Sequence, residues 1–249
     1  MRKIVTLVCL ILGSLLLVPA VHAADVDSDG DGLTDTQEIN IYHTDPNLAD
    51  TDADGFPDGT EVKQGYYPLF GNKKKMVDID SDKDSLNDAW EIALGTDITN
   101  LDTDGDSYKD GQEVLAGYNP SDSEPIKLEK IIQVNLKTQH LSYLLGNTVL
   151  EEFPISSGLK NTPTPIGKFD VLQKRPTVHY KGVGFDFPNT KWNLRFKQGP
   201  TLSYYIHGAY WHDKFGKPMS HGCVNVSYAN MERLYNWADV GTQIKIAKS

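Results

Sequence analysis

The pattern of apolar residues differs between the two halves of the chain. In the C-terminal half, apolar and polar residues alternate over short runs, beginning with Ile132, Val134 and Leu136. A period of two predicts a β-strand with one buried face. Apolar residues at helical spacing predict a helix at 228–237. Further strands are expected at 139–145, 151–156, 169–172, 204–207 and 241–246. We therefore expect residues 126–249 to form a mostly β domain with one or two helices.

The first residues have the pattern of a targeting segment. Two basic residues precede an apolar run from 4 to 18, and small residues at Val21 and Ala23 fit a signal-peptidase site. The run is shorter than the roughly 18 residues that a membrane span usually needs. We expect residues 1–23 to be a signal peptide and the protein to be exported to the periplasm, cell envelope or extracellular space. No membrane span is then expected after cleavage.

Cleavage has a consequence for the cysteines. It removes Cys9 and leaves Cys223 as the only cysteine of the mature chain. An internal disulfide is then excluded, and an exported unpaired thiol is either intermolecular or reactive.

Charge is distributed unevenly between the halves. Residues 24–125 carry 26 acidic and 6 basic residues, a net charge of −20. Residues 126–249 carry 8 acidic and 16 basic residues, a net charge of +8. Such asymmetry indicates two modules with different partners. The acidic half does not suit nucleic acid, and the basic half has no dense basic run or binding motif, so no nucleic-acid partner is expected.

One acidic pattern recurs four times, at 27–38, 50–61, 80–91 and 102–113. Each copy has aspartate at positions 1, 3, 5 and 9, glycine or serine at position 6, and glutamate at position 12. The candidate metal ligands are Asp27, Asp29, Asp31, Asp35 and Glu38; Asp50, Asp52, Asp54, Asp58 and Glu61; Asp80, Asp82, Asp84, Asp88 and Glu91; and Asp102, Asp104, Asp106, Asp110 and Glu113.

Alternating carboxylates in a tight loop converge on one point and form an all-oxygen site of the kind that Ca²⁺ prefers. Four copies in register favour bound cations, because like charges held this close repel one another. Ser85 and Ser107 stand where the turn prefers glycine, so the third and fourth sites are expected to be weaker. Paired EF-hands are not expected, because position 8 lacks the usual apolar residue and the flanking helices are short.

The acidic segment resembles thrombospondin type 3 calcium repeats over residues 25–122. The resemblance implies a chain wrapped around structural Ca²⁺, with little regular structure, little core of its own and little order without metal. We assign residues 24–118 to this repeat region. Residues 119–125, rich in proline, serine and acidic residues, are expected to be a linker.

Candidate chemistry lies in the basic half. The Ser-His-Gly-Cys block at 220–223 places an imidazole beside the Cys223 thiol, and His207 lies upstream. A thiol attacks as its thiolate, so it needs a base, and His207 fits that role. The Gly208 carbonyl is a candidate to orient the ring, and amides near Gly222 and Cys223 are candidates to hold an oxyanion. Spacing alone leaves open which histidine is the base.

His207-Gly208 followed by Ser220-His221-Gly222-Cys223-Val224-Asn225 resembles the signature of the L,D-transpeptidase catalytic domain family. The segments 153–158 and 164–167 resemble earlier blocks of that family, and the resemblance covers nearly all of 131–246. It implies a β-sandwich-like domain. It also implies Cys223 as nucleophile and His207 as proton acceptor and donor, with His221, Ser220, Gly222 and Gly208 shaping the site and no cofactor for catalysis.

The implied reaction is acyl transfer on peptidoglycan stem peptides through a Cys223 thioester. D-Alanine leaves, and a neighbouring stem amine accepts the acyl group to give a 3→3 cross-link. Asn225, Tyr210 and Trp211 are candidate substrate contacts, although the two aromatics fit packing roles equally well. Two departures, a short 207–220 loop and Asn225 where many members carry arginine, bear on substrate choice.

Three alternatives stay open on the sequence. Water as acceptor would make the protein an L,D-carboxypeptidase. A non-enzymatic, calcium-dependent wall-binding protein would retain the motif as a relic. A papain-like peptidase is disfavoured, because those families place cysteine before histidine and this chain has the reverse order.

Overall fold

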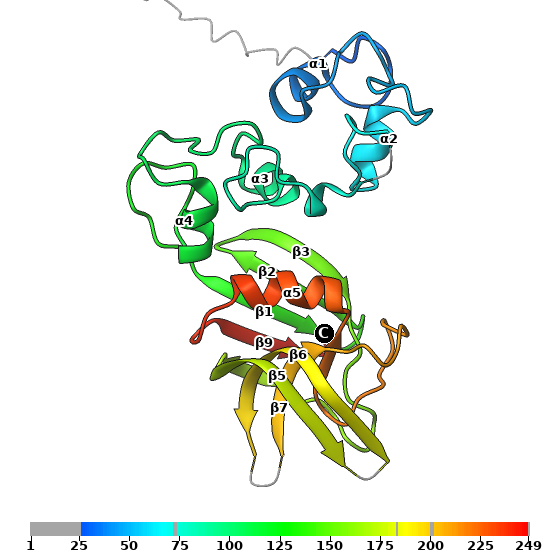
Figure 1. Ribbon diagram of the computed structural model, residues 1–249, viewed down its shortest axis with the longest axis vertical. Coiled ribbons are helices and arrows are strands. Elements are labelled where there is room, and N and C mark those ends of the chain that lie inside the picture. The colour runs from blue at the N-terminus through cyan, green and yellow to red at the C-terminus, as the bar shows by residue number, and fades with distance from the viewer. Residues whose placement is uncertain (1–25, 72–73, 183, 200–201, 249) are drawn as a thin grey trace, which may run out of the picture.

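The computed structural model describes residues 26–71, 74–182, 184–199 and 202–248, and the expected signal peptide lies outside this part of the chain. Two β-sheets form the C-terminal domain (Figure 1). The first has the order β3 (Thr148–Pro154), β2 (His140–Leu145), β1 (Lys130–Asn135), β9 (Gln243–Ala247), β4 (Gly167–Asp170). The second has the order β5 (Gln173–Gly182), β6 (Phe185–Gln198), β7 (Ser203–Gly208), β8 (Val224–Val226). β1–β9 and β7–β8 are parallel and the other pairs antiparallel. The expected mostly β fold is confirmed.

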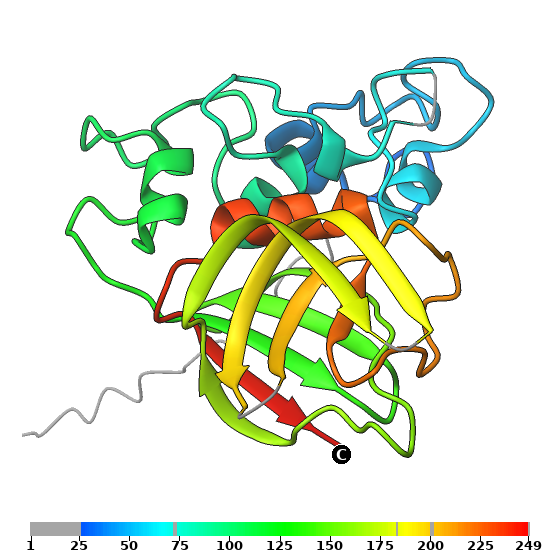
Figure 2. The ribbon, with the colours of Figure 1, turned by 60° about the horizontal axis from the view of Figure 1, so that its bottom comes forward.

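The two sheets and helix α5 (Tyr228–Trp237) share one hydrophobic core. On β1, Ile132 and Val134 are buried and Gln133 between them is exposed, as the period of two predicts. Figure 2 shows α5 between the strands and the repeat region. Its buried face consists of Met231, Leu234 and Trp237.

The long β5–β6 hairpin and the short strand β8 are absent from the sequence-based expectations. No residue of β5 is fully buried, whereas all three residues of β8 are. Neither strand therefore shows the alternation that marks a half-buried strand.

The repeat region consists of loops joined to short helices. The α-helices are α1 (Asp35–Gln37), α2 (Asp58–Lys63), α3 (Asp88–Leu94) and α4 (Asp110–Ala116), with a π-helical turn η1 (Glu38–Tyr42) and a 3₁₀ turn η2 (Met76–Asp78). Their shortness agrees with the expectation of little regular structure. None of the helices in the described ranges is long and apolar enough to cross a membrane.

The third and fourth repeats are not separate from the C-terminal domain. Leu86, Trp90 and Val114 are buried in the same core cluster as Tyr143 and Phe153. A small second cluster, built on Tyr67, Met76 and Ile98, lies within the repeat region. This small cluster agrees with the expectation of repeats with little core of their own, and the third and fourth repeats also use the core of the neighbouring domain.

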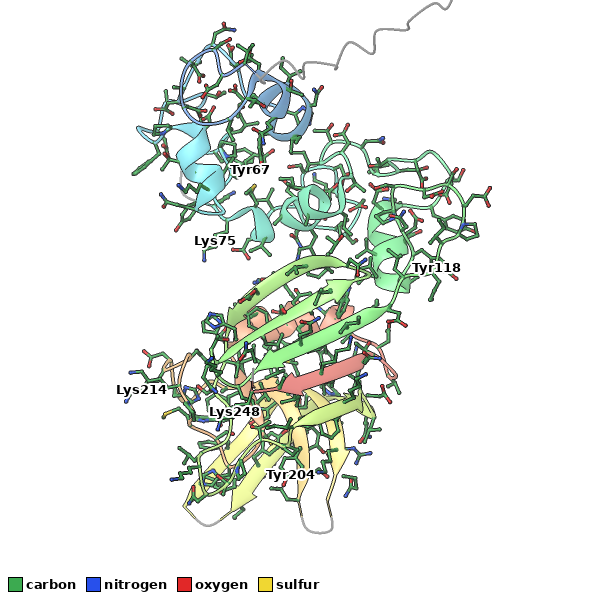
Figure 3. All side chains as sticks on the ribbon, turned by 180° about the vertical axis from the view of Figure 1, so that it is seen from behind. Tyr67, Lys75, Tyr118, Tyr204, Lys214 and Lys248 are labelled. Atoms are coloured by element: carbon green, nitrogen blue, oxygen red, sulfur yellow. The ribbon has the colours of Figure 1, made fainter. Side chains whose placement is uncertain are left out.

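The segment expected to be a linker folds back on itself. The amide of Asn119 donates to the Ile126 carbonyl (3.0 Å), and Tyr118 forms a β-bridge with Lys127. Tyr118 lies at this junction between α4 and β1 (Figure 3). Lys130 then donates through Nζ to the carbonyls of Leu115 in α4 (2.5 Å) and of Trp237 in α5 (2.7 Å). The junction fixes α4 beside the domain.

These contacts predict that a repeat residue stabilises the C-terminal domain. Trp90→Ala removes a side chain that is 5% exposed, and large-to-small core changes of this kind cost about 3–5 kcal/mol. The loss in the free energy of unfolding is measured by urea unfolding, followed by the tryptophan fluorescence of the C-terminal domain. Tyr108→Ala, at a side chain 63% exposed, is the control and should change little. Equal unfolding of wild type and Trp90→Ala would contradict the shared core.

Candidate functional site

The pairing of β7 with β8 brings the histidine and the cysteine together. His207 pairs with Asn225 across these parallel strands, and Ile206 pairs with Val224. Side chains alternate along a strand, so Asn225 and Cys223, two residues apart, share the face of His207. The alternate residues Ile206 and Val224 are buried in the core. Cys223, His207 and Asn225 all line one cavity of about 450 Å³.

The His207 ring is held on two sides. Its Nδ1 lies 2.9 Å from the Gly208 carbonyl oxygen, which can only accept, so Nδ1 carries the proton and Nε2 keeps its lone pair. Tyr180 stacks on the ring at 4.6 Å between centroids, and its hydroxyl donates to Asn193 (2.9 Å). Burial lowers the pKa of His207 to about 4. The imidazole is therefore neutral near pH 7 and able to accept a proton at Nε2.

The thiol is also neutral at rest. Burial raises the pKa of Cys223 to about 11, although a backbone hydrogen bond with Tyr205 acts in the opposite direction. The resting site is therefore a thiol with a neutral imidazole rather than an ion pair. A base must take the proton as the sulfur attacks. His207, His212 and His221 all line the cavity, and His207 is the one whose Nδ1 is held by the Gly208 carbonyl.

The Ser220 hydroxyl holds the turn that carries the thiol. Its Oγ donates to the Cys223 carbonyl (2.5 Å) and accepts from the Gly222 amide (3.1 Å). Gly222 has φ of +119°, and a Cβ there would lie 2.9 Å from the Tyr204 ring, so the position requires glycine. The Gly222 amide is thus engaged within the turn. The oxyanion role expected for the amides near Gly222 and Cys223 stays a prediction.

One wall of the cavity comes from the β5–β6 hairpin, and most of the other lining residues lie between positions 211 and 223. Phe187 lies flat on Trp211, with 3.8 Å between centroids, and Phe185 stacks on His221 (4.9 Å). Together with Tyr180, these two phenylalanines line the cavity. Sequence reasoning missed all three. The alternating aromatics of Phe185-Asp186-Phe187 were the signal available.

Two of the three expected substrate contacts lie in the cavity wall, and the third does not. Trp211 and Asn225 line the cavity, and the Asn225 amide nitrogen lies 3.2 Å from Nε2 of His212. Tyr210 is not among the lining residues. It is 49% exposed and donates its hydroxyl to the Pro188 carbonyl (3.0 Å).

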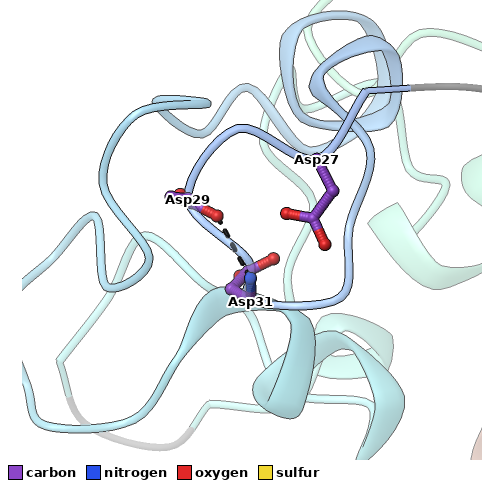
Figure 4. A group of neighbouring side chains, drawn as sticks. All are labelled: Asp27, Asp29 and Asp31. Atoms are coloured by element: carbon purple, nitrogen blue, oxygen red, sulfur yellow. Dashed lines mark hydrogen bonds between the residues drawn. The ribbon is translucent and has the colours of Figure 1, made fainter.

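The acidic loops gather their carboxylates as the repeat predicts. In each loop, the aspartates at positions 1, 3 and 5 place one oxygen each within 4.8 Å of the others. Figure 4 shows this group for Asp27, Asp29 and Asp31. The corresponding groups are Asp50, Asp52 and Asp54; Asp80, Asp82 and Asp84; and Asp102, Asp104 and Asp106.

The buried glutamates at position 12 favour a cation bound in each loop. All four are buried, and each has at least one oxygen without a hydrogen-bond partner among the described residues: Glu38, Glu61, Glu91 and Glu113. Burial, reinforced by the loop aspartates, raises the pKa of Glu91 to about 9 and of the other three to about 7. Buried carboxylates without partners are costly, and a cation of calcium's size fits these oxygens.

The aspartates at position 9 have another role. Each accepts both the amide and the hydroxyl of the serine or threonine at position 2, and each begins an α-helix. The pairs are Asp35 with Ser28, Asp58 with Thr51, Asp88 with Ser81, and Asp110 with Thr103. These four expected ligands close the loops. The groups gathered within 4.8 Å consist of positions 1, 3 and 5 and include neither the position-9 aspartates nor the position-12 glutamates.

The model of the L,D-transpeptidase catalytic domain family matches residues 129–246. The C-terminal domain belongs to this family. The bacterial thrombospondin type 3 repeat model matches residues 27–49, 50–65 and 102–123. The third acidic loop, 80–91, lies outside those matches.

Two relatives of the transpeptidase domain are Bacillus subtilis proteins. The putative L,D-transpeptidase YqjB is 26% identical over 134 residues, which cover 51% of this chain and 76% of that protein. The putative L,D-transpeptidase YkuD is 27% identical over 127 residues, which cover 51% and 71%.

Solved structures of L,D-transpeptidases are similar to this chain over about half of its length. An L,D-transpeptidase from Mycobacterium smegmatis has 25% identity and a TM-score of 0.45, covering 49% of this chain and 60% of that one. An Enterococcus faecium L,D-transpeptidase has 27% identity and a TM-score of 0.44, covering 48% and 50%. This chain therefore spans only part of each solved protein.

In the transpeptidase domain, the loop that joins the two earlier sequence blocks, 153–158 and 164–167, contacts the turn at 220–223. The Leu159 amide donates to the Ser220 carbonyl (3.0 Å), and so does the Thr162 hydroxyl (3.3 Å). The Gly158 amide donates to Thr164 Oγ1 (2.8 Å), and a Cβ on Gly158 would lie 2.2 Å from the Thr162 carbonyl oxygen. The loop therefore packs directly against the turn that ends at Cys223.

The lowered pKa of His207 makes stability depend on pH. The unfolded chain takes up a proton near pH 6.5 and the folded chain only near pH 4, so stability falls as pH drops through this window. The loss attributable to this side chain reaches about 3 kcal/mol at pH 4.

Urea unfolding of wild type and His207→Gln at pH 7 and at pH 4.5 measures this effect. The variant should lose less stability on acidification, because the other acid-sensitive groups are common to both proteins. Equal losses would show that His207 is accessible to protons in the folded state.

Proposed function

We propose that this protein is an exported L,D-transpeptidase that acts on peptidoglycan stem peptides. The observation that carries the proposal is the pairing of a Cys223 thiol with a neutral His207 imidazole in one cavity of a transpeptidase domain. The aromatic walls and the flanking Asp213 and Lys214 suit a peptide that carries both carboxylate and amine groups.

Acylation is the first step. The Cys223 sulfur attacks the carbonyl carbon between the third residue of a tetrapeptide stem and its terminal D-alanine, while Nε2 of His207 takes the thiol proton. The C–N bond then breaks, and His207 returns the proton to the leaving D-alanine amine. The product is a thioester on Cys223.

Transfer is the second step. An amine from a neighbouring stem attacks the thioester carbonyl, the C–S bond breaks, and the amine proton passes through His207 to the departing sulfur. The result is a 3→3 cross-link and a restored thiol. The Gly208 carbonyl keeps Nε2 directed toward the cavity in both steps.

We further propose that the acidic loops bind Ca²⁺ as a structural cofactor. The support is the set of buried, unpartnered glutamate oxygens beside each group of three aspartates. The position-1, position-3, position-5 and position-12 carboxylates would hold the ions. Bound Ca²⁺ would neutralise the loops and stabilise their fold.

The reaction is tested by mass spectrometry of a disaccharide-tetrapeptide incubated with the mature protein, residues 24–249. We expect loss of D-alanine together with a cross-linked dimer. Cys223→Ala should lose both products, because no other cysteine is present in residues 24–249. D-Alanine loss without dimer would indicate a carboxypeptidase, and no change at all would favour a wall-binding protein.

Calcium binding is tested by calorimetry and circular dichroism of the mature protein. Ca²⁺ should bind with measurable heat, and a chelator should change the spectrum, because the loop carboxylates then repel one another. Mg²⁺ is the control ion, since its smaller octahedral shell fits such loops poorly. Identical spectra with calcium and with chelator would contradict the proposal.

A further inference from the structure

We propose that the third acidic loop is the calcium site of the transpeptidase domain itself: an ion held by Asp80, Asp82, Asp84 and Glu91 keeps α3 seated on the first sheet. This inference rests on the proposed calcium binding of the loops, and it assigns to one of them a separate role.

The third loop is the most buried of the four acidic loops, because its Asp84 is the only buried aspartate among positions 1, 3 and 5 of the described loops. Asp84 is 2% exposed and Glu91 is fully buried. Both oxygens of Glu91 and Oδ2 of Asp82 are buried without a hydrogen-bond partner in the described structure. Buried anions without partners destabilise a fold unless a cation compensates them. The loop also lies outside the segments that match the repeat model.

The ligands of this loop alternate with core residues of the domain. Trp90 precedes Glu91 on α3 and meets Tyr143 of β2 edge to face, with 5.6 Å between centroids. Leu86, at position 7 of the loop, is 1% exposed in the same core. α3 packs on β3. An ion that fixes the loop therefore fixes the side chains that cover Tyr143.

A polar cluster of Tyr143, Glu151 and Arg233, called the clamp below, joins the sheet beneath α3 to α5. The Tyr143 hydroxyl donates to Glu151, which pairs with Arg233 of α5 (Nη2 to Oε1, 2.7 Å). Nη1 of Arg233 also lies 3.4 Å from Asp78, two residues before the first ligand. The glutamate side of this clamp is largely buried, so it contributes more than a surface ion pair would.

The other end of α5 reaches the catalytic histidine. Tyr228, its first residue, packs so closely on Gly208 that a Cβ there would lie 2.6 Å from the tyrosine ring. The Gly208 carbonyl is the acceptor for Nδ1 of His207. The helix clamped beside the third loop thus also supports the residue that orients the base.

The first loop provides a matched comparison. It has the same ligand positions, Asp27, Asp29, Asp31 and Glu38, and a buried glutamate. Within the described residues, 27–38 make no hydrogen bond, ion pair or ring contact with 126–248. Its ion would stabilise the repeat region without bearing on the transpeptidase domain.

Hydrogen exchange followed by mass spectrometry tests the difference. Peptides spanning 140–154 and 228–237 are compared with calcium and with chelator in wild type, in Asp82→Asn/Glu91→Gln, and in Asp29→Asn/Glu38→Gln. At a calcium concentration 100 times the dissociation constant, binding shifts the folding equilibrium about 100-fold. Exchange in these peptides should slow by up to that factor in wild type and in the first-loop variant. The third-loop variant should show no such slowing.

Terbium luminescence excited through tryptophan gives a second readout. Trp90 directly precedes Glu91, so an ion bound beside Glu91 should be sensitised, and Trp90→Phe should remove most of the signal. Asp80→Asn, a milder change at a partly exposed ligand, should weaken terbium binding without unfolding the domain.

The outcomes separate the two proposals. No heat of calcium binding in wild type would overturn the calcium proposal as a whole. Calcium binding that protects the repeats but leaves peptides 140–154 and 228–237 unchanged would overturn this inference alone. Equal protection of those peptides in the third-loop variant would overturn it as well, because the protection would then come from another loop.

Discussion

The parallel pairing of β7 with β8 is the interaction on which the site depends. It sets His207 opposite Asn225 and puts the Cys223 thiol on the same face, two residues away. A shift of one residue in this register would turn the thiol into the core and expose Val224. The buried valines of β8 and Ile206 of β7 hold the register, because they pack only when they face inward.

Burial then sets the chemistry of the pair. A water-poor site disfavours charge on either partner, so it raises the pKa of the thiol and lowers that of the imidazole. A neutral pair is a less reactive resting state than an ion pair, because the thiolate is the nucleophile. Reaction then requires a substrate whose developing charge is stabilised within the cavity. A neutral thiol of this kind reacts slowly until a substrate fills the cavity.

Much of this could be predicted from the sequence, because the informative residues act locally. The acidic loops and the turn around Cys223 are short segments whose geometry depends on their own residues. The role of Gly208 as acceptor for His207 follows the same logic. Contacts between distant segments could not be predicted. The stacking of Phe187 on Trp211 and the seat of Trp90 on Tyr143 depend on the tertiary fold.

The acidic loops show most clearly which residue roles the sequence does not predict. Position 9 carries the same residue type as positions 1, 3 and 5, so composition alone makes it a ligand. Its carboxylate is instead satisfied by the residue at position 2, as Asp88 is by Ser81. The hydroxyl at position 2, present in all four copies, was the available signal, but a loop sequence does not show which carboxylate that hydroxyl meets.

A smaller regularity joins the repeats in pairs. Glycine occupies position 10 only in the second and fourth copies, as Gly59 and Gly111. Each donates its amide to the position-5 aspartate of the preceding copy: Gly59 to Asp31 (2.6 Å) and Gly111 to Asp84 (2.5 Å). A Cβ at either glycine would lie within 2.7 Å of a backbone carbonyl oxygen, so no larger residue fits without movement.

The hydrogen bond between Gly111 and Asp84 joins the third and fourth repeats to each other. Asp84 is at once a candidate ligand of the third loop and the acceptor for the first turn of α4. An ion in the third loop would therefore order α3 directly and α4 through Gly111. Both helices bury a side chain in the transpeptidase core, Trp90 from α3 and Val114 from α4. The first pair of repeats has the same internal bond between Gly59 and Asp31, but Leu33 and Val62 are not part of that core. The same local device thus serves two ends: in the first pair it holds repeat to repeat, and in the second it also holds the repeats to the enzyme.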